Sequence, residues 1–133
     1  MPKPKILVVD DDKNVVQIIA VNLRYEGMEV IEAYDGEEAL LKAETERPDL
    51  ILLDIMMPSM DGIEVCRRLK RITALADVPI IMLTAKTMDE DMLAGWEAGA
   101  DDYLTKPFNP LGLIQRVKIR LQERGISLNS SSR

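Results

Sequence analysis

The sequence contains no histidine and only one cysteine, Cys66, among its 133 residues. Without histidine, the chain lacks the side chain that most often serves as a general base or a transition-metal ligand. A single cysteine excludes an internal disulfide bond and fits a reducing compartment. Because Cys66 lies within a helical pattern, we expect it to be a small buried hydrophobic residue rather than a reactive thiol.

Long hydrophobic runs and an excess of positive charge are also missing. No apolar run approaches the roughly 20 residues of a membrane span, and the first residues lack the apolar core of a secretion signal. We therefore expect a cytoplasmic protein with no contact to a membrane. Aspartate and glutamate number 23 against 17 lysines and arginines, which gives a net charge of −6. Direct binding to nucleic acid is not expected from this balance.

What remains is the composition of one ordinary globular domain, with 47% hydrophobic and 30% charged residues. Strand-like apolar runs alternate with helical patterns five times. We predict strands over Lys5–Val9, Glu29–Ala33, Leu50–Leu53, Val78–Leu83 and Asp102–Thr105. We predict that each strand is followed by a helix, the last four over about residues 36–46, 62–72, 88–98 and 110–124. This alternation predicts an open, doubly wound α/β fold around a parallel sheet, since five units are too few for an eight-fold barrel.

Polar side chains follow the ends of four of these predicted strands. The carboxyl ends of parallel strands meet at one edge of a sheet, where such folds bind their ligands. The residues expected there are Asp10, Asp11 and Asp12 after the first strand, Asp54 after the third, Thr84 after the fourth and Lys106 after the fifth.

Clustered carboxylates at this edge need compensation. Two like charges about 4 Å apart at an effective dielectric of about 20 repel by roughly 4 kcal/mol. A divalent cation would remove that cost, and oxygen ligands without histidine or cysteine favour Mg²⁺. Lys106 and Thr84 could contact phosphoryl oxygens, so the set suits phosphoryl transfer. Taken alone, Asp12 is also a good helix N-cap and Lys106 an ordinary solvated charge.

Four segments together resemble the receiver domain of two-component response regulators, and most closely the receivers of the winged-helix transcription-factor subfamily. The resemblance covers about residues 4–124, and the segments are Ile6–Asp12, Leu52–Gly62, Pro79–Ala85 and Gly99–Phe108. It implies a five-stranded sheet of flavodoxin-like order 2-1-3-4-5 and a phosphorylation-dependent signalling switch rather than an enzyme. Residues 1–124 would form the receiver domain, and the polar tail over residues 125–133 would be disordered.

The resemblance also implies a role for each residue of the site. Asp54 would accept a phosphoryl group from a phosphohistidine of a sensor histidine kinase or a phosphotransfer protein. Asp11, Asp54 and the backbone carbonyl of Met56 would bind Mg²⁺ directly, and Asp10 would act through water. Lys106 would bind phosphoryl oxygens.

Three further residues would complete this site and its switch. Thr84 would bind phosphoryl oxygens and move toward the new phosphoryl group, and Tyr103 would turn inward behind it, a local charge event that biases a two-state surface. The Lys106–Pro107 bond would be a cis peptide, which proline makes accessible.

In the winged-helix subfamily, receivers dimerise through the fourth helix, the fifth strand and the fifth helix. Glu97 with Lys118 and Asp102 with Arg116 resemble two of its intersubunit ion pairs, while a third pair is absent because Met92 and Gly112 occupy its positions. An apolar centre could be formed by Leu93, Trp96 and Ile114. The alternative is that Leu93 and Ile114 belong to the core and that the charges are solvated.

Other readings of the same residues remain open. A haloacid-dehalogenase-type phosphatase would use Asp10 and Asp12 in an Asp-x-Asp motif, but Asn14 departs from its pattern and Asp54 would have no role. A flavodoxin-like cofactor carrier would need a phosphate-binding loop, which the acidic Asp10–Asn14 segment opposes. The winged-helix transcription-factor subfamily normally carries a DNA-binding domain after the receiver. The chain is therefore either a stand-alone receiver or a piece of a longer regulator.

Overall fold

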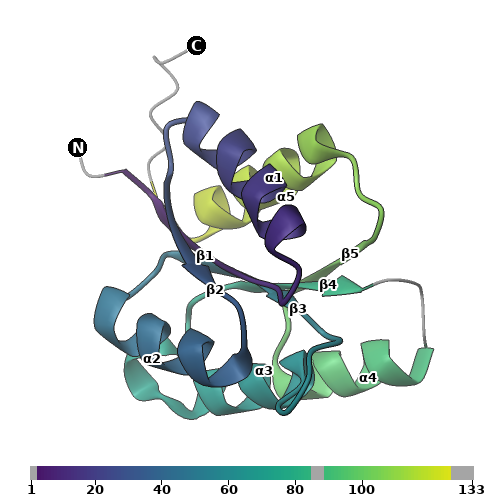
Figure 1. Cartoon of the computed structure of the whole chain (residues 1–133). Helices are drawn as coiled ribbons and strands as arrows, with labels where there is room; N and C mark the ends of the chain where they lie inside the picture. The colour runs from purple at the N-terminus through teal and green to yellow at the C-terminus, as the bar shows by residue number, and fades with distance from the viewer. Residues whose placement is uncertain (1–2, 85–88, 127–133) are drawn as a thin grey trace.

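The structure is a computed structural model that describes residues 3–84 and 89–126, with side chains described for residues 3–84 and 94–126. Within these ranges, one parallel sheet has the strand order β2-β1-β3-β4-β5, which confirms the predicted fold. Figure 1 shows α1 and α5 covering one face of the sheet and α2, α3 and α4 covering the other. The strands are β1 Lys5–Val9, β2 Glu29–Ala33, β3 Leu50–Asp54, β4 Ile80–Thr84 and β5 Asp102–Thr105. The helices are α1 Lys13–Tyr25, α2 Gly36–Glu46, α3 Gly62–Arg71, α4 Asp89–Ala98 and α5 Pro110–Glu123, with a short 3-10 helix, η1, at Thr73–Leu75.

The predicted bounds of β4 are wrong at both ends. The strand begins at Ile80 rather than Val78 and ends at Thr84 rather than Leu83. Val78 belongs to the turn that follows η1, because its backbone N–H donates to the Leu75 carbonyl at 3.0 Å. Pro79 has no N–H to offer a neighbouring strand. In the sequence, the apolar Val78 therefore resembles a strand residue although it precedes β4.

The two central strands β1 and β3 are buried on both faces. Leu7 and Ile51 point into the core under α2, α3 and α4, while Ile6 and Leu50 point into the core under α1 and α5. Such strands appear in sequence as continuous apolar runs because helices cover both sides. The last residue of β3 is Asp54, which is therefore a buried carboxylate at the carboxyl edge of the sheet.

Helix ends follow the expected local chemistry. Asp12 caps α1 by accepting a hydrogen bond from the Asn14 N–H at 2.9 Å, as predicted. Gly99 and Gly125 adopt positive φ angles of 109° and 83° after α4 and α5, which glycine tolerates without a steric cost.

Cys66 is buried, as predicted, with its sulfur 3.6 Å from the Ala98 carbonyl oxygen. Burial raises the pKa of the Cys66 thiol to about 11, which keeps it protonated near neutral pH. In the described ranges, no helix combines the length and the apolar character that crossing a membrane requires.

Candidate functional site

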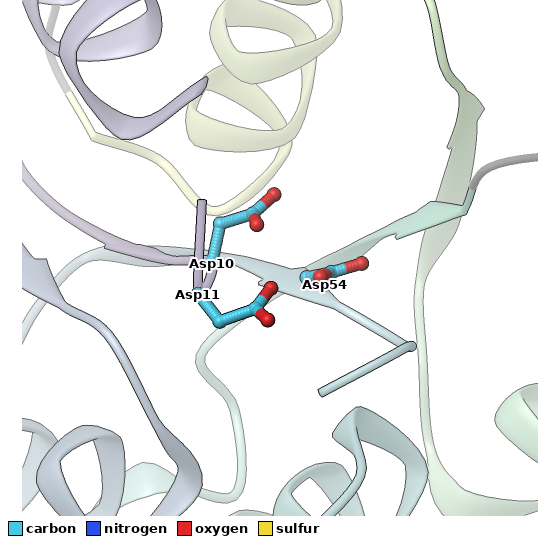
Figure 2. Close-up of side chains that lie close together, drawn as sticks. All are labelled: Asp10, Asp11 and Asp54. Carbon is cyan, nitrogen blue, oxygen red and sulfur yellow. The ribbon is translucent and has the colours of Figure 1, made fainter. Parts of the chain in front are cut away.

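Three carboxylates meet at the edge of the sheet where β1 and β3 end. Figure 2 shows Asp10 and Asp11 beside Asp54, although more than forty positions of sequence separate them. One carboxylate oxygen from each residue lies within 4.8 Å of the others. Asp10 and Asp54 are buried, whereas Asp11 is exposed. The predicted acidic cluster therefore exists, and Asp11 lies on its solvent side.

Asp10 is held at the site by two donors. Its carboxylate accepts a hydrogen bond from the Asp12 backbone N–H at 2.9 Å and from the Lys106 Nζ at 2.7 Å. Lys106 Nζ also lies 3.5 Å from the Asp54 carboxylate. The loop after β5 therefore brings one ammonium group to both buried carboxylates, as predicted from the strand ends.

The Asp54 carboxyl group is in an environment that disfavours its charge. It accepts the Met56 N–H at 3.3 Å. Burial first, and then the neighbouring charge of Asp10, raise its pKa to about 7, while Lys106 acts in the opposite direction. For Lys106, burial lowers the pKa, but the hydrogen bond to Asp10 and the charges of Asp54 and Asp10 outweigh it and raise the pKa overall. The ammonium form of Lys106 is therefore favoured.

The residues present fit a divalent cation. Three clustered carboxylates face one ammonium group in the described part of the chain, so negative charge is in excess when all are ionised. Burial first, and then the charge of Asp10, raise the pKa of Asp54, and a bound cation would offset both effects. A ligand set made only of oxygen suits Mg²⁺. The expected contribution of the Met56 carbonyl stays a prediction.

Thr84 and Pro107 complete the same edge. Thr84 is buried at the end of β4. In the parallel pairing of β3 and β4, Asp54 is the register partner of Leu83, the residue before Thr84. The Thr84 carbonyl accepts the Lys106 N–H at 2.6 Å, and this bond joins the ends of β4 and β5. The Lys106–Pro107 peptide bond is cis, the isomer that the resemblance implied.

Tyr103 lies away from the carboxylates, against α4. Its ring is half-buried beside the core under α2, α3 and α4. The ring centroids of Tyr103 and Trp96 are 4.9 Å apart at an angle of 60°, an edge-to-face contact. Tyr103 is thus placed between the sheet and α4, and its switch role stays a prediction.

Several of the expected dimer residues form contacts within the chain. Arg116 lies 2.6 Å from Asp102, and Lys118 lies 2.7 Å from Glu26 at the end of α1. Ile114 is only 5% exposed and packs in the core under α1 and α5, so it has little surface to offer a partner. Trp96 is 47% exposed and Glu97 is also exposed. The Leu93 and Met92 side chains lie outside the described residues.

The chain matches the family model of the response regulator receiver domain over residues 6–118. It is 53% identical over 127 residues to the alkaline phosphatase synthesis transcriptional regulatory protein PhoP of Bacillus subtilis, covering 96% of this chain and 52% of that protein. It is 48% identical over 120 residues to the DNA-binding response regulator MtrA of Mycobacterium tuberculosis, covering 90% of this chain and 51% of that protein. The chain thus spans about half the length of these curated relatives.

Solved structures with the same fold include receivers of two other organisms. A CheY-like receiver domain protein from Methanospirillum hungatei superposes with a TM-score of 0.88 and 34% identity, covering 92% of this chain and 97% of that one. The chemotaxis protein CheY4 of Vibrio cholerae gives a TM-score of 0.85 and 38% identity, covering 88% and 98% of the two chains. With this fold, these site residues and these relatives, the chain belongs to the family of response regulator receiver domains.

Proposed function

We propose that this chain is a phosphorylation-dependent signalling switch in which Asp54 is the phosphoacceptor. One observation carries the proposal: the buried Asp54 carboxylate lies at a strand end beside Asp10, Asp11 and the Lys106 ammonium group. A carboxylate in that position has a nucleophilic oxygen and neighbours that can offset the charge of a phosphoryl group. This arrangement suits phosphoryl transfer, in which positioning and charge neutralisation supply most of the catalysis.

In the proposed reaction, an Asp54 carboxylate oxygen attacks the phosphorus atom of a phosphohistidine. A P–O bond forms, the P–N bond breaks, and the imidazole leaves with the electron pair of that bond and takes up a proton from solvent. The product is an acyl phosphate on Asp54. Asp11, Asp54 and the Met56 carbonyl would hold Mg²⁺ directly and Asp10 would do so through water, and the bound ion would supply positive charge beside the phosphoryl oxygens.

The chain's own residues account for the remaining steps. Lys106 can pair with a phosphoryl oxygen as a point charge, because its ammonium group already lies 3.5 Å from the Asp54 carboxylate. The Thr84 hydroxyl can donate a hydrogen bond to another oxygen from the neighbouring strand end. A contact of Thr84 with the phosphoryl group would then change the packing around Tyr103 and the surface of α4, β5 and α5.

The donor would be a sensor histidine kinase or a phosphotransfer protein, and the chain itself would catalyse only its own phosphorylation and dephosphorylation. The relatives PhoP and MtrA are named as transcriptional or DNA-binding regulators, so an output that controls transcription is the setting we propose. Residues 1–124 would act as the receiver in the cytoplasm, without contacting DNA directly. Most of the predicted disordered tail, residues 127–133, lies outside the described residues.

Labelling by a small phosphodonor in the presence of Mg²⁺ tests the proposal. We expect Asp54→Asn to abolish labelling, because the amide is not a nucleophile toward phosphorus, while the fold survives this isosteric change. Asp35→Asn is the matched control, because Asp35 caps α2 through the Glu38 N–H at 2.8 Å and asparagine caps equally well. Undiminished labelling of the Asp54 variant would refute the assignment.

A further inference from the structure

Gly62, the first residue of α3, lies directly against the backbone that carries Asp54. A Cβ atom built on Gly62 would overlap the Asp54 carbonyl oxygen and would lie 2.8 Å from the Ile55 Cα and 2.9 Å from the Asp54 carbonyl carbon. These neighbours are backbone atoms, which cannot rotate away as a flexible side chain could. Any side chain at position 62 therefore requires α3 or the end of β3 to move.

The end of β3 is held from two sides. On one side, the Ile55 N–H donates to the Leu83 carbonyl of β4 at 2.9 Å. On the other, the Ile55 carbonyl accepts the Gly62 N–H at 2.9 Å. The turn between Asp54 and Gly62 thus closes on the strand end itself, and the approach of α3 sets how far the backbone of residues 54–56 can shift.

The helix is not free to retreat from this contact. The Asp61 side chain caps α3 by accepting the Glu64 N–H at 2.9 Å. Val65, Cys66 and Leu69 of α3 are fully buried in the core, where close packing resists displacement. Because the helix resists displacement, we expect an atom added at position 62 to displace the backbone near Asp54.

We propose that Gly62 is a positioning residue of the phosphoacceptor site, because it lets α3 fix the spacing between the Asp54 carboxylate and the Met56 carbonyl. This inference rests on the proposed function, in which those two oxygens bind Mg²⁺. Mg²⁺ requires near-octahedral geometry at about 2.0–2.1 Å, whereas Ca²⁺ accepts flexible geometry at about 2.3–2.6 Å. A displaced Asp54 backbone therefore penalises Mg²⁺ more than Ca²⁺, and a general loss of stability would not.

Titration calorimetry of the full chain with Mg²⁺ alone and with Ca²⁺ alone tests the proposal. We expect Gly62→Ala to weaken Mg²⁺ binding by about ten- to a hundredfold, the usual effect of disturbing groups around a metal site, with a smaller loss for Ca²⁺. Gly112→Ala is the matched control, because Gly112 also lies in the first turn of a helix but a Cβ there would be 3.9 Å from the Asn109 Cβ. A Mg²⁺ to Ca²⁺ affinity ratio equal to that of the wild type, or an equal change in the control, would overturn the inference.

A second variant covers the case in which Gly62→Ala does not fold. Asp61→Ala removes the cap and loosens the first turn of α3 without adding an atom. We expect it to lower the ratio of Mg²⁺ affinity to Ca²⁺ affinity, but by less than Gly62→Ala does. An unchanged affinity ratio would count against the inference. Labelling of the wild type separates the two proposals. If the wild type binds Mg²⁺ but accepts no phosphoryl group at Asp54, the proposed function fails. If it is labelled and neither variant shifts the metal ratio, only the role of Gly62 fails.

Discussion

At the scale of single residues, the burial of the Asp54 carboxyl group disfavours its charge and also favours the binding of a cation. This carboxyl group is buried beside Asp10, and both effects raise its pKa to about 7. A group with this pKa is partly protonated near neutral pH even beside the Lys106 ammonium group, and a bound cation would favour its full ionisation. The burial and the Asp10 charge that make the site attract a cation therefore also make the stability of the cation-free protein depend on pH.

We expect the Asp54→Asn variant to be more stable than the metal-free wild type at high pH. The folded pKa of Asp54 is about 7, above the ordinary value of 3.8, so between these values the folded state binds more protons than the unfolded state. Stability contributed by this group is present below about pH 4, falls as pH rises and levels off above about pH 7. Urea unfolding should show a variant advantage of at most about 4 kcal/mol at pH 8, since one pKa unit corresponds to about 1.36 kcal/mol, and little advantage at pH 4. An advantage that is independent of pH would contradict this explanation.

At the scale of elements, α4 lies against β5 at Gly95 and Trp96, among the residues whose side chains are described. A Cβ atom on Gly95 would overlap the Tyr103 hydroxyl oxygen and lie 2.8 Å from the Tyr103 Cζ, and Trp96 contacts the same ring edge-to-face. The Tyr103 ring thus occupies space that only glycine leaves open on α4. Any residue with a side chain at position 95 would have to share that space with the aromatic residue expected to act in the switch.

We expect Gly95→Ala to displace the Tyr103 ring and to destabilise the fold by about 1–3 kcal/mol through overpacking. In the Tyr103→Ala background, Gly95→Ala should lower the free energy of unfolding by less, because the ring is absent and alanine is a better helix former than glycine. A double-mutant cycle with Tyr103→Ala, followed by urea unfolding and by Trp96 fluorescence, measures the coupling. Additive free energies in that cycle would show that the two residues do not share this space.

Local patterns were sufficient to predict most elements and the acidic part of the site. β3 was predictable because helices cover both its faces and make it a continuous apolar run, and Asp10 and Asp54 follow from strand ends meeting at one edge. The turn at Val78, the η1 helix and the close approach of Gly62 to the Asp54 backbone were not predictable in this way. They depend on how distant segments approach one another, which neither helical nor strand periodicity encodes.

At the scale of the whole molecule, three of the four charges expected to join two subunits, Asp102, Arg116 and Lys118, are paired within one chain. Asp102 lies 2.6 Å from Arg116 and 3.2 Å from Arg120, and Lys118 lies 2.7 Å from Glu26. Glu26 follows the end of α1, so its pair with Lys118 joins α1 to α5, which lie side by side in Figure 1. An intersubunit pair between Lys118 and Glu97 would have to compete with this contact.

We expect sedimentation to show a monomer without beryllofluoride and a shift toward dimer with beryllofluoride and Mg²⁺. Glu26→Gln should strengthen that dimer by about two- to fivefold, because it frees Lys118 from an ion pair that is worth roughly 0.2–1 kcal/mol at a surface. Glu46→Gln is a suitable control, since Glu46 pairs with Lys5 at 3.6 Å, away from α5. A monomer in both states would exclude dimerisation driven by phosphorylation. If Glu26→Gln and Glu46→Gln change the strength of the dimer equally, Lys118 does not bridge the subunits. The interface would then depend on exposed groups such as Trp96.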